Sequence, residues 1–459
     1  MKLNNKGFAI SGVLYSLLIL FVTLFMGILT ILGTTKFSFD KIKNDIINKM
    51  ENSLYKEDRL NGADPKIKSG MIPVVIENNG TVKKADLTRE WYNYSQKKWA
   101  NVVTVTNDTK ANYENASAGT VISEEDILTY LVWVPRFRYK LWYTEATDTS
   151  TTQDVSKVHS IDIIFETKNT TKSSSTIVEE YLTHPAFTFG TEELNGFWVG
   201  KFETGYSGAT SLEQALVSSI DTNKIIIKPN NYAWRMMSVS NIHSMVTNMN
   251  ADENIFSLAN DVNSHLMKNT EWGAVAYLSH SMYGKGDEVA INNSSYYKTG
   301  CGSNSMDEAN STTCHNAYGT VTTYKQSTTG NISGIFDMSG GAWEYVMGYS
   351  EETTSAYDLS GFTTTTFPQD KYINKYSSTN LTQYSKRILG DATGEMGPFS
   401  YSTDYYSSWY NDLAIFPNTS GPWVIRGGDF KSTTKAGMFS FSTGNGDSNS
   451  EYSFRIVIS

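Results

Sequence analysis

Cysteine and histidine are scarce in this sequence. Its 459 residues include two cysteines and six histidines, which excludes a disulfide-dense scaffold and any zinc site built from three or four thiolates. No run of basic residues occurs, and 38 Lys and Arg against 47 Asp and Glu give a formal net charge of −9. We therefore expect no nucleic-acid partner.

Aromatic and small polar residues are plentiful by comparison. Phe, Trp and Tyr together make up 13% of the chain, whereas charged residues make up only 19%. Ser, Thr, Asn and Gly fill the stretches between apolar runs. This composition is typical of a β-rich globular body with long loops rather than of a disordered chain. At roughly 150 residues per domain, the length predicts two or three units.

One long apolar run stands near the N-terminus. Residues 8–32 contain no charged side chain, and Lys2 and Lys6 precede them. As a helix the run would span about 37 Å, enough to cross a hydrocarbon core of about 30 Å. A cleaved secretory signal has a shorter apolar stretch and a small-x-small cleavage site, and neither is present here. The run predicts a single-pass membrane anchor in the mature protein.

The sequence Lys6-Gly7-Phe8 ahead of this run resembles the N-terminus of type IV pilins and pseudopilins. In that family a prepilin peptidase cuts after the glycine, so the resemblance implies cleavage between Gly7 and Phe8 and a possible partnership in a pilin-like assembly. The glutamate that the family usually has at the fifth mature position is Gly12 here. A processed anchor and a plain signal anchor both stay open, and both place the body at the cell surface.

The chain divides into four predicted segments. Residues 1–35 hold the pilin-like transmembrane helix, and residues 36–61 form an amphipathic stalk helix, because Ile, Met and Leu recur there at helical spacing. Residues 62–115 form a small β-rich element with the runs M-I-P-V-V-I and A-N-V-V-T-V. Residues 116–459 form the body.

Within the body, five separated motifs occur in one order: L-V-W-V-P, G-F-W-V-G-K-F-E, N-T-E-W-G-A-V-A-Y, G-I-F-D-M-S-G-G-A-W-E-Y, and V-I-R-G-G-D-F followed by S-F-R-I-V. In this order they resemble the successive signatures of the formylglycine-generating (sulfatase-modifying factor) family. The resemblance implies an α+β, C-type-lectin-like fold with extensive irregular structure.

The motif D-M-S-G-G-A-W-E-Y carries the candidate metal site. In the family it is a calcium loop, and the resemblance places carboxylate ligands at Asp337 and Glu344 and backbone carbonyl ligands at Gly340 and Ala342. Calcium prefers such hard oxygen ligands, and the paired glycines permit a tight backbone. In the alternative interpretation, Asp337 caps a turn and Glu344 bonds to backbone amides without a metal.

Catalysis is not expected from this body. The copper-using members of the family have a reactive cysteine pair shortly after the R-G-G motif, because Cu(I) prefers thiolate ligands. After Arg426-Gly427-Gly428 this chain has neither cysteine nor histidine, so no copper site is expected. The six histidines form no H-x-x-x-H cluster, so no iron site is expected either. The sequence favours an inactive, ligand-binding domain, and a copper-dependent oxidase is the enzyme alternative.

The two cysteines, Cys301 and Cys314, lie close together in one polar, Gly-containing stretch. Because the body is expected outside the cytoplasm, we predict a disulfide between them. Two buried free thiols are the alternative.

Two stretches, residues 401–410 and 429–452, mix aromatic residues with Ser, Asn, Asp and Gly, a composition suited to adaptable recognition of a protein or glycan. The second also resembles the variable region of retroelement-diversified receptors, which is an alternative function beside a structural minor pilin. The predicted ligand-binding residues are Tyr405, Tyr406, Trp409, Tyr410, Phe430, Phe439, Phe441, Asn445, Asn449 and Tyr452.

Overall fold

The computed structural model describes residues 18, 19, 21–23, 62–142, 160–169, 181–351, 360–376, 388–397, 399–401 and 406–459. The chain forms two compact units, Met1–Asp58 and Arg59–Ser459. Most of the predicted membrane anchor, the whole stalk and the cleavage position at Gly7 and Phe8 lie outside the described residues. None of the helices in the described ranges combines the length and the apolar character that a membrane span requires.

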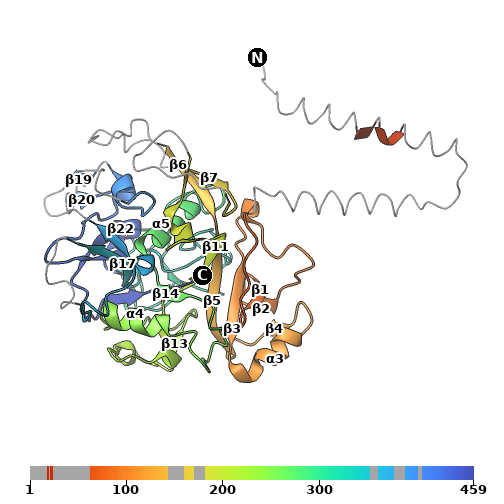
Figure 1. The fold of residues 1–459 in the computed structure, drawn as a ribbon, viewed down its shortest axis with the longest axis horizontal. Helices are drawn as coiled ribbons and strands as arrows, with labels where there is room; N and C mark the ends of the chain where they lie inside the picture. Colours follow the sequence, from red (N-terminus) through yellow and green to blue (C-terminus); the bar gives the residue numbers. More distant parts are fainter. Residues whose placement is uncertain are drawn as a thin grey trace, which may run out of the picture. The chain divides into compact units, whose positions relative to one another are not determined.

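An antiparallel eight-stranded sheet runs through the second unit (Figure 1). Its middle strands are buried along their length because their apolar runs need cover on both faces. The predicted element 62–115 is not a separate sheet, since β3 pairs directly with β5. In order across the sheet, the strands are β14 (Ser264–Leu266), β24 (Ile456–Ile458), β11 (Gly196–Gly200), β5 (Ile127–Pro135), β3 (Asn101–Val105), β1 (Ile72–Ile76), β2 (Val82–Lys84) and β4 (Val121–Ile122).

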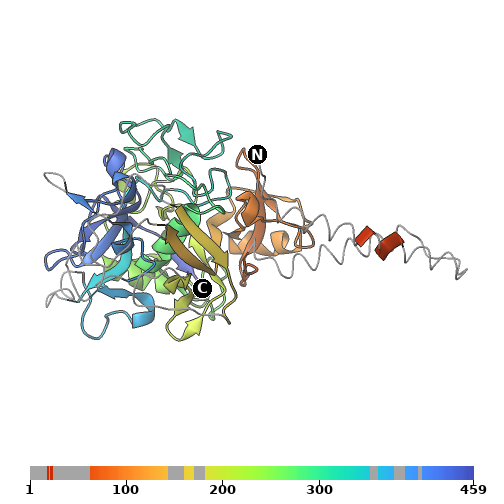
Figure 2. The same cartoon turned by 90° about the horizontal axis from the view of Figure 1, so that it is seen from above.

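A five-stranded sheet lies on the opposite side of the unit from β1–β4, and both views show this separation (Figures 1 and 2). Its central strand β17 pairs in parallel with β18 and β23 and antiparallel with β21. The strands of this sheet are β17 (Trp343–Ser350), β18 (Asn374–Tyr376), β21 (Trp423–Gly427), β22 (Gly437–Gly444) and β23 (Tyr452–Phe454).

Smaller sheets and irregular segments complete the unit. One sheet has three strands and the others are two-stranded hairpins or pairs. These strands are β6 (Phe137–Trp142), β7 (Ser160–Phe165), β8 (Leu182–Thr183), β9 (Thr188–Phe189), β10 (Glu192–Glu193), β12 (Gly205–Tyr206), β13 (Ile225–Ile226), β15 (Cys301–Gly302), β16 (Asn316–Ala317), β19 (Ser400–Tyr401) and β20 (Tyr406–Ser407).

The described helices are few and short. The Ser238 side chain accepts the Asn241 N–H at the start of α4 (Val239–Thr247), and Glu271 accepts the Lys268 N–H at the start of α5 (Asn269–Ser279). A helix α3 (Asn107–Asn115) lies at the end of the predicted β-rich element 62–115, and it buries no residue. The described chain is thus a mixed α/β fold, mostly sheets with few helices, which is compatible with the predicted C-type-lectin-like class.

A buried ion pair joins the two large sheets. Arg455, between β23 and β24, donates from Nε and Nη2 to the Glu344 carboxylate on β17 at 3.0 and 2.5 Å. Its Nη1 donates to the Gly200 carbonyl at the end of β11 at 2.8 Å. Both side chains of the pair are at most 1% exposed. Because the guanidinium contacts both sheets, it fixes one against the other.

A buried histidine adds a pH-sensitive element to the core. His184 is fully buried among aromatic rings that include Phe137, Tyr139 and Tyr277. Burial lowers the pKa of His184 to about 3, and its Nδ1 accepts the Ala186 N–H at 3.2 Å.

Removing one partner of the Arg455–Glu344 pair is expected to destabilise the body by about 3–5 kcal/mol, because the other charge stays buried without its partner. Urea unfolding of Glu344→Gln and Arg455→Met measures this cost. The exposed pair Lys431–Glu451 is the control, and Glu451→Gln should cost at most about 1 kcal/mol. Equal losses of unfolding free energy at the two pairs would contradict the role of Arg455–Glu344 in joining the two sheets.

The His184 imidazole stays neutral in the folded state down to about pH 3, whereas in the unfolded chain it takes up a proton near pH 6.5. Its contribution to stability is therefore complete above about pH 6.5 and is lost as the pH falls toward 3. Between pH 7 and pH 5, the unfolding free energy of the wild type should fall by about 2 kcal/mol more than that of His184→Gln. An unchanged pH dependence in His184→Gln would refute the assignment.

Candidate functional site

The C-terminal loop, residues 445–451 between β22 and β23, is fixed through its backbone. Gly446 has a φ of +84°, and a Cβ atom there would lie 2.6 Å from the Trp423 ring, so this position requires glycine. Donors from distant segments bond to the loop's carbonyl oxygens. They are Val239 N–H to Gly446 (2.9 Å), Met236 N–H to Asn449 (2.9 Å), Trp343 N–H to Glu451 (3.1 Å), the Tyr345 hydroxyl to Asp447 (3.0 Å) and Arg235 Nη1 to Ser450 (2.6 Å).

The side chains of this loop face solvent. Asn445, Asp447, Ser448 and Ser450 are exposed. Asn445 makes two contacts within the loop: its Nδ2 donates to Asp447 Oδ2 at 2.9 Å, and its Oδ1 accepts the Asp447 N–H at 3.2 Å. The anchors from distant segments bind main-chain oxygens, so they do not depend on which side chains these positions carry. The loop therefore presents a set of short polar groups on a rigid frame.

A small separate core supports the loop from beneath. The Phe430 and Tyr297 rings meet edge to face with centroids 4.9 Å apart, and the Arg235 guanidinium lies 3.9 Å above the Tyr297 ring. Ala233 and Ala342 complete this cluster. Sequence reasoning singled out neither Arg235 nor Tyr297, because no motif joins them to the loop and the contact spans some two hundred residues of chain.

Four of the predicted ligand-binding aromatics belong to the core. Trp409, Phe430, Phe439 and Phe441 are at most 6% exposed. The prediction counted them as surface groups because they alternate with Ser, Thr and Gly, but β22 is buried on both faces from Gly437 to Phe441. These rings present no surface to a ligand and instead fill space between β22 and its neighbours.

The other predicted residues do not form one surface. Tyr410 is half-buried, with its ring parallel to that of Phe439 near the start of β22, whereas the C-terminal loop begins after the other end of this strand. Six residues of strand separate Phe439 from Asn445, a distance of about 20 Å. Tyr406 is also half-buried at the Tyr410 end, and Tyr405 lies outside the described residues. Asn445, Asn449 and the half-buried Tyr452 belong to the loop or its edge.

The predicted calcium ligands are engaged with protein donors. Asp337 Oδ1 accepts hydrogen bonds from Asn292 Nδ2 at 2.8 Å, Gly300 N at 2.9 Å and Gln326 Nε2 at 2.8 Å. Both oxygens of Glu344 bond to Arg455. Across the described ranges, no group of three or more His, Cys, Asp or Glu side chains is placed to hold a metal ion. Calcium at Asp337, Gly340, Ala342 and Glu344 would require these partners to move, and it stays a prediction.

A third buried carboxylate, Glu203, lies beside this motif. Its Oε1 accepts the Ala342 N–H at 2.8 Å. Burial, together with Glu344 and Asp337, raises the pKa of Glu203 well above its usual range, and burial raises the pKa of Glu344 to about 7 in spite of Arg455. Glu203 ends the G-F-W-V-G-K-F-E motif, but sequence reasoning assigned it no role, since nothing in its spacing connects it to Asp337.

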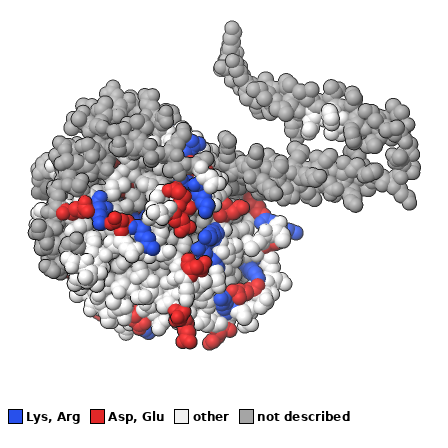
Figure 3. Space-filling view, viewed as in Figure 1, with Lys and Arg blue, Asp and Glu red and all other residues white. Residues whose placement is uncertain are grey.

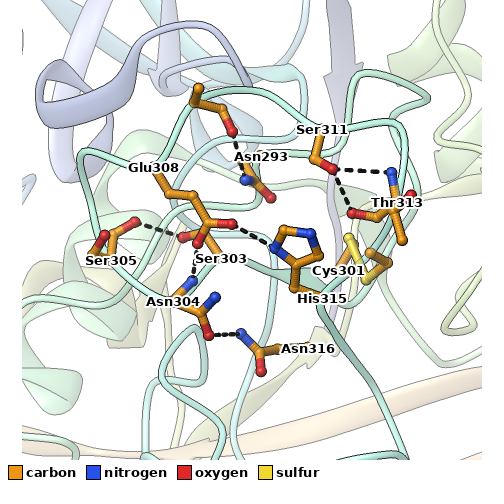
Figure 4. A network of polar contacts seen from close by, with 12 residues as sticks. Asn293, Cys301, Ser303, Asn304, Ser305, Glu308, Ser311, Thr313, His315 and Asn316 are labelled. Carbon is orange, nitrogen blue, oxygen red and sulfur yellow. Dashed lines mark hydrogen bonds and ion pairs between the residues drawn. A yellow bond between two sulfur atoms is a disulfide. The ribbon is translucent and has the colours of Figure 1, made fainter.

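The two cysteines form one side of a polar network (Figure 4). Cys301 and Cys314 are joined by a disulfide, with Cα atoms 5.3 Å apart. Next to it, His315 Nδ1 lies 2.6 Å from Glu308 Oε1, and Glu308 Oε2 accepts the Asn304 N–H. The disulfide and these contacts hold the loop between β15 and β16 closed. Both sulfur atoms are therefore used within this loop.

A cavity of about 390 Å³ lies between residues 64–68, which precede β1, and the strands β5 and β11. Lys66, Lys68 and Lys168 line it together with Glu192 and Asp261. Figure 3 shows a similar interleaving of positive and negative side chains on the described part of the face that it draws. Because the lining carries charges of both signs, the cavity points to no single class of charged ligand.

No protein-family model matches this chain. No curated protein matches it. Among solved structures, the fold is similar to one described as "Major Tropism Determinant I1 Variant", with a TM-score of 0.27 and 10% sequence identity, over 87% of this chain and 86% of that chain. At this score the similarity establishes neither fold nor function. The resemblances to the formylglycine-generating family and to pilins stay predictions from the sequence.

Proposed function

We propose that this chain is a cell-surface binding protein. The apolar run 8–32 anchors it in the membrane, and the body lies outside the cell and binds a protein or glycan. The observation that supports binding is the C-terminal loop, whose backbone is fixed by distant donors while Asn445, Asp447, Ser448 and Ser450 face solvent. A frame fixed before binding loses little conformational entropy when a ligand docks, which favours affinity. The anchor and the surface location rest on residues 8–32 alone.

A second candidate is a receptor whose loop is diversified by a retroelement. The same anchoring favours it, because hydrogen bonds to main-chain oxygens survive almost any side-chain replacement at the four exposed positions. Under this proposal, sequences of close relatives differ at Asn445, Asp447, Ser448 and Ser450 and agree at Arg235. Differences spread evenly over the body would exclude it.

The proposed function predicts that the loop's side chains can be removed without loss of stability. The full-length chain in detergent micelles with Asn445, Asp447, Ser448 and Ser450 all changed to Ala should melt within about 2 °C of the wild type, because each change lies at the surface. Its binding to an array of glycans and random peptides should fall at least about tenfold, since the recognition groups are gone.

Glu125→Ala, an exposed change on a distant segment, is the matched control and should keep both properties. Array binding retained in the four-fold variant would refute the loop as the ligand site. A melting temperature lowered by many degrees would instead show that these side chains support the fold.

Calcium is a proposal of its own. An ion bound at Asp337, Gly340, Ala342 and Glu344 is expected to stabilise the folded state, so replacing calcium by EGTA should lower the melting temperature by a few degrees. Asp337→Asn should abolish this difference, whereas the surface change Asp447→Asn should preserve it. Identical melting temperatures of the wild type in calcium and in EGTA would remove calcium from the proposal.

A further inference from the structure

Met236 has an unusual backbone conformation beside the C-terminal loop. Its φ is +76°, in the left-handed region where residues other than glycine are strained. The Met236 N–H donates to Asn449 O at 2.9 Å, which fixes this conformation against the loop. The side chain is 37% exposed, so packing in the core does not explain why methionine stands here. A strained residue with an exposed apolar side chain points to a function outside the fold.

Arg235 holds the strained backbone in place. It donates from Nη1 to Ser450 O at 2.6 Å, from Nη2 to Leu212 O at 3.0 Å and from Nε to Ala233 O at 3.3 Å. Three segments therefore meet at one guanidinium, which also packs on Tyr297. Because Arg235 is only 2% exposed, it braces the surface and does not itself form part of it.

A second apolar side chain is carried by a segment bridged to Arg235, the neighbour of Met236. Leu216 pairs with Arg235, the residue before Met236, and is 36% exposed. Leu216 and Met236 thus lie on segments that are joined through Arg235 and Met236 to the C-terminal loop. An apolar centre with a polar rim is the anatomy of protein–protein interfaces, where methionine is enriched because its flexible thioether adapts to a partner.

The exposed charges near these two side chains are mainly negative. Asp447 and Glu213 are exposed, and neither forms an ion pair within the part of the chain that the structure describes. The Arg235 guanidinium interacts electrostatically with Glu213 but is only 2% exposed, and Lys431 is engaged with Glu451 at 2.5 Å. The net charge of −9 adds a long-range attraction for a basic partner.

We infer that Met236 and Leu216 are the apolar centre of a protein-binding surface whose rim is the C-terminal loop. The partner is a protein that presents an apolar side chain flanked by Lys or Arg. A glycan would use hydroxyl hydrogen bonds and stacking on aromatic faces, and Met236 and Leu216 offer neither. The inference rests on the proposed function and deepens it, because it names the class of ligand and a contact outside the loop.

The test uses the full-length chain in detergent micelles and an array of random synthetic peptides of about twelve residues. Bound peptides should be enriched in Lys or Arg next to Leu, Ile, Met or Phe. Met236→Gly should bind these peptides at least about tenfold more weakly, because it removes an anchor side chain. Its melting temperature should equal or exceed that of the wild type, because glycine accepts the left-handed conformation without strain.

Two controls separate the side chain from the fold. Met282→Gly removes a methionine that is 67% exposed elsewhere on the surface, and it should leave peptide binding unchanged. Met236→Leu should retain most of the binding, since an apolar side chain remains.

Each outcome bears on one claim. Unchanged binding in Met236→Gly, enrichment of acidic or purely polar peptides, or no peptide binding at all would overturn the inference. The proposed function would still stand in these cases if changing the four loop side chains to Ala abolished binding to a glycan or peptide on the array. Loss of binding in Met236→Gly and in the loop variant, with both proteins folded, supports both claims.

Discussion

The buried ion pair between Arg455 and Glu344 is the constraint on which the arrangement of this body depends. One guanidinium bonds to β17 through the carboxylate and to the end of β11 through Gly200 O, so the eight-stranded and five-stranded sheets share a fixed joint. Arg455 directly follows β23, the strand into which the C-terminal loop leads. Burying two charges costs desolvation free energy, so the pair contributes little net stability. Its main effect is to fix one geometry at the base of the loop.

Charge balance is a second constraint at the same joint. Glu203, Asp337 and Glu344 are all buried, and Arg455 is the cation that bonds to one of them. Carboxylates this close in a medium of low dielectric cannot all be ionised beside a single positive charge. Burial, together with the neighbouring Glu344 and Asp337, raises the pKa of Glu203, which favours its neutral form and eases this repulsion.

The sequence pattern predicted those strands that are determined by their own apolar residues. The apolar runs of β1 and β3 need no knowledge of the rest of the chain. The strand β17 was missed, because it directly follows a glycine-rich turn motif and was interpreted with it. Composition also misjudged Phe439 and Phe441, since a loop and a buried strand flanked by small residues have the same residue types. The anchors of the C-terminal loop are long-range contacts, which one sequence cannot reveal.

The buried Arg235 and the exposed residues beside it have different roles in the proposed binding surface, whose segments are far apart in the sequence. Met236 and the C-terminal loop are more than two hundred residues apart in the chain, and each alone would be mobile at a surface. Arg235 lies beneath both and bonds to the Leu212 and Ser450 carbonyls. The strain at Met236 is then sustained by the contacts of its neighbour rather than by its own packing. Because the buried residues fix the backbone, the exposed side chains are not needed to hold it in place.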